Sequence, residues 1–325
     1  MARRRRTLQA VLILLALGAS VASCSSGSKR AQPELTSTAT TADTLPLDTV
    51  ASSATDVYQG SEPRRQLRFH PAVGATFQTK VSYVEHTSYA DGYSGTGPVP
   101  VPPIYADVTT TVDAVDPDGT IRGTFRFANI TIDTSSTDRV NAAAAQASFQ
   151  SLIGVTGTLA MRPTGTVTSF RTDAPPGLDD IATVWLARLS NSLQQLILPF
   201  PTEPVGEDAV WKVPVSLDFD GLQSSATYSV SLTRLTTDHI DLALKYSQTA
   251  PLGPVPFAGL PAGVTAELLA FHIDGAGTQQ TDLTQILPSS SSLKASGDIL
   301  FRLLQGPIDV RLDQKIAIEV TAAAG

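Results

Sequence analysis

The run Tyr228-Ser229-Val230-Ser231-Leu232-Thr233 alternates large apolar side chains with small polar ones. Successive side chains of an extended chain point to opposite faces, so this run can bury one face and leave the other in solvent. The run 240–245 repeats the alternation after a short turn. Together the two runs predict an antiparallel hairpin whose apolar face covers a core.

The same pattern recurs along much of the chain. Runs 108–115 and 121–132 form a second predicted hairpin, joined by Asp116-Pro117-Asp118-Gly119, a sequence that suits a tight turn. The remaining strand predictions are 76–86, 157–161, 167–171, 210–219, 266–276, 292–304 and 309–320. About eleven strands in short connections are typical of an antiparallel meander.

Two helices interrupt the predicted strands. The first covers about 138–153, with Ser135 as its cap and an alanine-rich centre. The second follows Pro175-Pro176 and stops before Pro199. Its apolar side chains recur at helical spacing along one face: Leu178, Ile181, Trp185, Leu189, Leu193, Leu196 and Ile197. Such a stripe is typical of a core helix, and the alternative is that part of it lines a pocket.

These elements predict a mainly β fold. We expect a large, twisted antiparallel sheet, similar to half a barrel, wrapped over the two α-helices, because an open sheet of many strands curls. A β-sandwich is the alternative. The hollow of a curled sheet would place the pocket residues Ile181, Trp185, Leu189 and Leu193 against an apolar ligand.

The N-terminus has the three parts of a secretion signal. Four arginines at 3–6 precede an apolar run at 8–17, and Val21-Ala22-Ser23 leads to Cys24, the single cysteine of the chain. The apolar run is shorter than the ~20 residues of a spanning helix. This arrangement predicts a signal peptide over 1–23 and leaves open whether export follows the general or the twin-arginine route.

The residues around Cys24 resemble the lipobox of bacterial lipoproteins. That resemblance implies cleavage after Ser23, a diacylglyceryl group on the thiol of Cys24, and acylation of the freed amine with a chain such as palmitate. Each buried methylene contributes roughly 0.8 kcal/mol, so two or three chains hold a protein at a membrane permanently. The expected location is extracytoplasmic, anchored to the outer face of the bacterial cell membrane.

Composition divides the rest of the chain. Residues 24–66 are rich in Ser, Thr and Ala, and this composition predicts a disordered tether behind the lipidated cysteine. Residues 67–325 are then a single β-rich domain. Removing 1–23, which carries four arginines and no acid, takes the formal net charge from −7 to −11. Such an acidic chain is a poor partner for nucleic acid or for anionic headgroups.

No residue pattern predicts catalysis or a bound metal. The histidines at 70, 86, 239 and 272 lie in no recognisable motif. Ser291-Ser292-Leu293-Lys294 matches S-x-x-K but lacks the companion motifs of penicillin-recognising enzymes. Ala114 occupies the first ligand position of a calcium-loop pattern that includes Asp116 and Asp118. We therefore expect a protein that is not an enzyme and has no cofactor.

Residues 198–206, Leu-Pro-Phe-Pro-Thr-Glu-Pro-Val-Gly, precede a strand at Trp211, and Val73-Gly74-Ala75-Thr76-Phe77 opens the body. These motifs resemble a family of functionally uncharacterised bacterial lipoproteins with an all-β body. The expected architecture is also similar to envelope lipoproteins that carry lipids or lipoglycans. It implies a membrane-anchored protein that binds or carries a lipid-like ligand. The alternative is a non-catalytic scaffold or interaction protein, whose protein partners stay open.

Overall fold

The computed structural model describes residues 50–51, 53–90, 97–100, 103–133, 146–219, 222–255, 264–305 and 308–324. In this part of the chain, no helix combines the length and the apolar character needed to cross a membrane.

The described strands form one antiparallel sheet of 15 strands. They are β1 (Val50–Ala51), β2 (Thr55–Tyr58), β3 (Thr76–Ala90), β4 (Gly97–Pro100), β5 (Ile104–Val115), β6 (Ile121–Ile132), β7 (Thr156–Met161), β8 (Val167–Asp173), β9 (Val210–Phe219), β10 (Leu222–Leu235), β11 (His239–Thr249), β12 (Gly253–Val255), β13 (Val264–Asp282), β14 (Ser290–Gln305) and β15 (Ile308–Ala324). The mainly β prediction is confirmed, and the single continuous sheet overturns the β-sandwich alternative.

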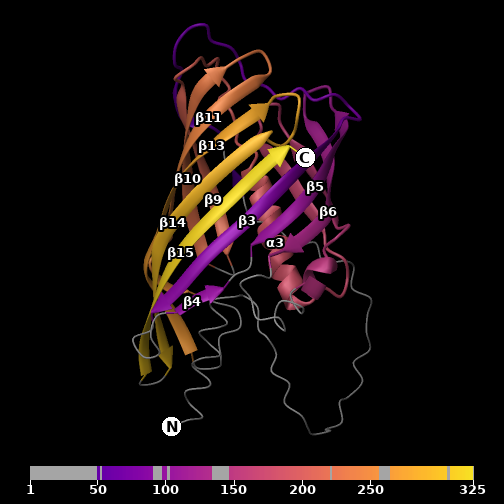
Figure 1. Ribbon diagram of the computed structural model, residues 1–325. Coiled ribbons are helices and arrows are strands. Elements are labelled where there is room, and N and C mark those ends of the chain that lie inside the picture. The colour runs from indigo at the N-terminus through magenta and orange to yellow at the C-terminus, as the bar shows by residue number, and fades with distance from the viewer. Residues whose placement is uncertain are drawn as a thin grey trace.

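The sheet consists of two meanders, which are joined where β3, the first long strand, pairs with β15, the last strand. The main path runs β1-β9-β10-β11-β13-β14-β15-β3-β5-β6-β7-β8, with β2 paired to β9, β4 to β3 and β12 to β13. The helix α3 (Asp180–Gln195) connects β8 to β9, so the chain passes from one side of the sheet to the other through this helix. Figure 1 shows α3 between the two halves of the curved sheet.

The alternating run from Tyr228 lies in β10 and pairs with β11 as predicted. Tyr228 lies opposite Tyr246, Val230 opposite Leu244 and Leu232 opposite Leu242, and all six side chains are buried. Because paired residues share a face, the alternation of both strands faces the same core. The predicted β5–β6 turn is also confirmed: Gly119 has a φ of +85° and donates its N–H to the carbonyl of Asp116 at 2.8 Å.

The helix α3 begins where its sequence predicts. Asp179 caps it by accepting a hydrogen bond from the N–H of Ala182 at 2.7 Å, and the helix ends before Pro199. The sheet surrounds it: Ser190 bonds Thr172 of β8 at 2.9 Å, and Gln195 accepts from Tyr228 of β10 at 3.2 Å. No side chain from 182 to 196 is exposed, so α3 is the centre of the fold.

Part of the first predicted helix is also present. Residues 146–150 are helical, and Gly154, with a φ of +89°, follows the turn that ends this segment. The rest of that prediction, 138–145, lies outside the described residues. Phe149 packs against Trp185 of α3 with ring centroids 5.6 Å apart, so the two helical segments share one core.

The predicted disorder of residues 24–66 is wrong for 53–66. Thr55–Tyr58 pairs with β9, Ser61 donates its N–H to the carbonyl of Glu207 at 2.8 Å, and Arg65 pairs with Val205. These contacts are made by the backbone, so the polar composition of the segment does not prevent them. The folded body therefore begins before Leu67; residues 24–49 lie outside the described part.

This docking gives a testable prediction at Gly206. A Cβ at Gly206 would overlap the carbonyl oxygen of Ser61, whereas a Cβ at Gly74 would meet nothing within 4 Å. We expect Gly206→Ala to cost about 1–3 kcal/mol and to release 53–66 to limited proteolysis, because the docked chain must move. Gly74→Ala is the control, with only the cost of its positive φ. Equal cleavage of 53–66 in both variants would contradict the docking.

Candidate functional site

The predicted lipidation site, Cys24, lies outside the described residues, as does the whole signal peptide. The structure first describes the chain at Val50, where β1 pairs with β9. Lipidation of Cys24 therefore stays a prediction.

The predicted apolar pocket residues lie in the core. Trp185, Leu189 and Leu193 lie on one buried face of α3, between the helix and the sheet. None of the three lines either of the two cavities described below. The side chain of Ile181 lies outside the described part of the structure. The apolar stripe thus fills the hollow of the sheet in the way that a core helix does.

A buried ionic cluster, which sequence reasoning missed, holds α3 against β3. Arg188 donates to the carboxylate of Glu85 at 2.9 Å, and the hydroxyl of Tyr83 donates to the same oxygen at 2.9 Å. The side chains of Arg188 and Glu85 are only 12% and 4% exposed. The guanidinium also lies 4.7 Å from the ring centre of Trp185. The sequence signal was present, because Glu85 follows Val81 and Tyr83 at the inward spacing of a strand.

The cluster changes the acidity of its tyrosine. Burial, followed by the nearby charge of Glu85, raises the pKa of the Tyr83 hydroxyl far above its usual value, so the group stays protonated and donates its hydrogen bond. Charge-assisted hydrogen bonds from two donors compensate the carboxylate for its lost hydration. This arrangement fixes the position of α3 in the sheet.

The first cavity is a small void beside the C-terminal end of α3. It has a volume of about 30 Å³ and is lined by Ser192, Gln195, Leu196, Leu198, Tyr228, Leu244, Gln279, Ser291 and Leu293. Burial raises the pKa of Tyr228, which therefore stays a hydrogen-bond donor to Gln195. A void of this size holds no more than a few water molecules. It has no room for a lipid chain while α3 stays in place.

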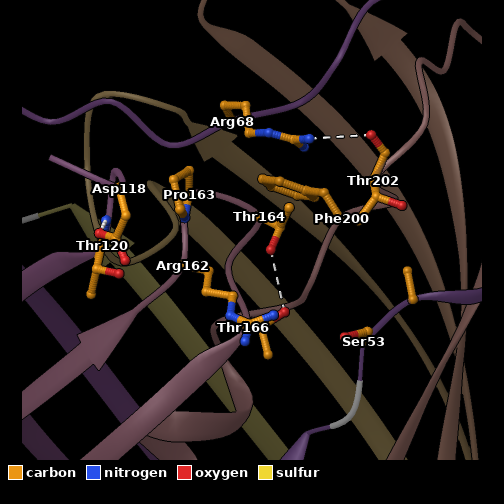
Figure 2. Close-up of a pocket in the computed structure, with 11 residues that line it drawn as sticks. Ser53, Arg68, Asp118, Thr120, Arg162, Pro163, Thr164, Thr166, Phe200 and Thr202 are labelled. Carbon is orange, nitrogen blue, oxygen red and sulfur yellow. Dashed lines mark hydrogen bonds between the residues drawn. The ribbon is translucent and has the colours of Figure 1, made fainter. Parts of the chain in front are cut away.

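The second cavity is larger, with a volume of about 410 Å³; it is half-open to solvent, and most of the residues in its walls are polar. Figure 2 shows Arg68 on one side of the Phe200 ring in this view and Arg162 on the other. Its walls are formed by Ser53, Ala54, Arg68, Asp118, Thr120, Arg162, Pro163, Thr164, Thr166, Phe200 and Thr202. Hydrogen bonds from the backbone and side chain of Thr120 hold the pKa of Asp118 below its usual value, so this wall carries a negative charge.

The residues that the sequence offered as possible catalytic groups do not lie close to one another. Lys294 is exposed, while Ser291 is buried on the other face of β14, so the S-x-x-K match forms no nucleophile and base pair. His70, His239 and His272 each lie beside an aspartate, at 3.2, 3.8 and 2.6 Å, rather than beside a serine. Across the described residues, no three His, Cys, Asp or Glu side chains gather where a metal could bind.

Comparison with known proteins gives no further assignment. No protein-family model matches this chain, and no curated protein matches it at a significant level. The resemblance to uncharacterised bacterial lipoproteins therefore stays a prediction from its motifs.

Proposed function

We propose that this chain is a lipid-anchored bacterial envelope protein that functions by binding a partner and not by catalysis. The anchor is the lipidated Cys24, behind a secretion signal whose parts are all present in the sequence. Residues 25–49, which separate the anchor from the described body, have the polar composition of a flexible linker. The expected location is the outer face of the cell membrane.

The enclosure of α3 by the sheet favours one of two binding roles, recognition at the surface over carriage of a ligand in the interior. The sheet contacts the helix from β3, β8 and β10, and the void beside it holds about 30 Å³. Because the centre of this domain is filled, a partner would bind at its surface and not in its interior. This supports a non-catalytic interaction or scaffold protein as the first candidate.

A carrier of an apolar, lipid-like ligand is the second candidate. One observation favours it: Leu293 and Ala295, on the same face of β14 as the buried Ser291, are only half-buried although they pack against the core. Part of the concave apolar face is thus left open next to the void. A lipid chain would fit only if α3 moved away from β13 and β14, so this role requires a mobile helix.

The anchoring is tested by the variant Cys24→Ala. We expect it to lose all labelling by a fatty-acid probe and to leave the membrane fraction, because Cys24 is the single thiol of the chain. Ser25→Ala is the matched control and should keep both the label and the membrane location. Equal labelling of wild type and Cys24→Ala would refute the lipoprotein assignment.

A further inference from the structure

The polar cavity of 410 Å³ is built from five segments that are far apart in sequence. They are residues 53–54, Arg68, the β5–β6 turn, the β7–β8 turn and the loop after α3. Backbone hydrogen bonds fix three of them to one another: Phe69 donates to the carbonyl of Pro163 at 2.7 Å, and Phe200 donates to that of Thr164 at 2.7 Å. The cavity walls are therefore held by the fold.

Two positive charges in this cavity lack a carboxylate partner. Arg68 donates to the carbonyls of Leu67, Pro201 and Thr202 at 2.8, 3.3 and 3.1 Å, which orient its guanidinium without neutralising it. The guanidinium of Arg162 is exposed and has no hydrogen bond or ion pair with another described residue, although its backbone N–H donates to the carbonyl of Thr166 at 2.9 Å. Elsewhere in the described structure, the arginines that pair with a carboxylate are Arg64, Arg122, Arg171, Arg188, Arg234 and Arg302.

The other polar groups of the cavity suit the hydroxyls of a ligand. Ser53, Thr120, Thr164, Thr166 and Thr202 bring hydroxyl groups to the walls. Thr202 already donates to Glu203 at 3.0 Å, and Thr164 and Thr166 share a hydrogen bond at 3.3 Å, but each of these oxygens can still accept a hydrogen bond from a ligand hydroxyl. The carboxylate of Asp118, ionised and exposed, accepts hydrogen bonds only. The volume lies within the roughly 300–1,000 Å³ of small-molecule sites.

We propose that this cavity binds a small phosphorylated polyol. Guanidinium groups bind phosphate through paired, charge-assisted hydrogen bonds, and Arg68 keeps two of its five N–H donors beyond those used for carbonyls. Arg162, whose guanidinium is not used by the protein, contacts the phosphate, and Arg68, on the other side of the Phe200 ring, adds positive charge to the cavity. Asp118 and the threonines contact the hydroxyls of the polyol, and this contact distinguishes such a ligand from bare phosphate.

The ligand chemistry has two sources, a free sugar or glycerol phosphate and the headgroup of a phospholipid. Because the chain as a whole is acidic, an anionic headgroup would be held by the local charge of the two arginines and not by the net charge of the body. Ser53 and Ala54 line the cavity, so only residues 25–52 separate it from the proposed anchor. Of these, residues 25–49 have the polar composition of a linker, and a flexible chain of that length has a root-mean-square reach of roughly 25–30 Å. The headgroup source rests on the proposed anchoring, whereas binding of the free ligand does not.

The test uses the mature chain with Cys24→Ala, which stays soluble and carries no acyl chain. Glycerol phosphate and inorganic phosphate are titrated by calorimetry, and vesicles of phosphatidylglycerol are compared with vesicles of phosphatidylcholine by co-sedimentation. We expect saturable binding of glycerol phosphate, tighter than that of inorganic phosphate. Arg162→Gln should weaken it roughly tenfold or more. Arg171→Gln, an exposed arginine on β8 outside the cavity, is the matched control.

Binding of glycerol phosphate alone supports the proposal with a free ligand as the source. Binding of phosphatidylglycerol vesicles that Arg162→Gln removes supports it with the headgroup as the source. No saturable binding in either assay, equal affinity for inorganic phosphate, or equal losses in Arg162→Gln and Arg171→Gln would overturn it. Because no variant carries a lipid, these outcomes are independent of whether Cys24 is acylated.

Discussion

Replacing Trp185 with alanine is expected to lower the free energy of unfolding by about 3–5 kcal/mol, a large share of the 5–15 kcal/mol that holds a domain together. Trp185 lies at the centre of the core, with the ring of Tyr83 5.8 Å away and that of Phe149 5.6 Å away. Truncation would remove both aromatic contacts and the surface on which Arg188 rests. Chemical denaturation followed by circular dichroism measures the loss.

Two controls separate this packing effect from a general effect on the helix. Trp185→Phe keeps an aromatic ring and should lose clearly less stability than Trp185→Ala. Val184→Ala changes the neighbouring, half-buried position of α3 and should cost less still. A loss below 1 kcal/mol for Trp185→Ala would contradict a filled core and would mean that the hollow of the sheet is loosely occupied.

The second large effect is expected at the buried ion pair. Arg188→Met keeps much of the apolar volume but leaves the carboxylate of Glu85 without its cationic partner, and breaking such a pair costs about 3–5 kcal/mol. The side chain of Glu85 is only 4% exposed, so water cannot replace the guanidinium of Arg188 without opening the core.

The double variant Glu85→Gln/Arg188→Met isolates the interaction. We expect it to be more stable than Arg188→Met alone, because a neutral amide at position 85 can still accept the hydrogen bond of Tyr83. Losses that simply add would contradict a coupled pair and would place the effect of Arg188 in its contact with Trp185. A denaturation series of the four proteins completes the cycle.

The long strands could be predicted because their side chains alternate over many residues. The bounds predicted for β6 and β9, 121–132 and 210–219, agree with the structure. The prediction for β13 stopped at 276, whereas the strand continues to Asp282. Glycine and polar residues interrupt the apolar alternation there, while backbone pairing with β11 and β14 continues.

The strands that the sequence did not predict are short, and each pairs with part of a longer strand: β1 and β2 with β9, β4 with β3, and β12 with β13. β1, β2, β4 and β12 are two to four residues long and pair through their backbones, so no run of alternating side chains marks them in the sequence. Proline in β4 and β12 also argues against a strand in a sequence pattern. Edge pairing depends on a neighbour that exists only after folding, which is why the predicted tether extended too far, to residue 66.

The polar cavity was not predictable for a related reason. Arg68, Asp118, Arg162 and Thr202 lie in separate turns, and no local spacing connects them. The sheet brings the turns together, so the cavity is a property of the topology. By contrast, the inward position of Glu85 follows from the alternation of β3 and was available from the sequence.

The proposed interaction role requires α3 to be locked at the centre of the sheet, since a mobile α3 would open the interior to an apolar ligand. Native-state hydrogen exchange measures this directly for the amides of α3 (Asp180–Gln195). We predict that the amides from Leu186 to Gln194 exchange only with global unfolding, at the same free energy as the core strands β10 and β11. Exchange of these amides through a local opening several kcal/mol below global unfolding would contradict the solid body and favour the carrier role.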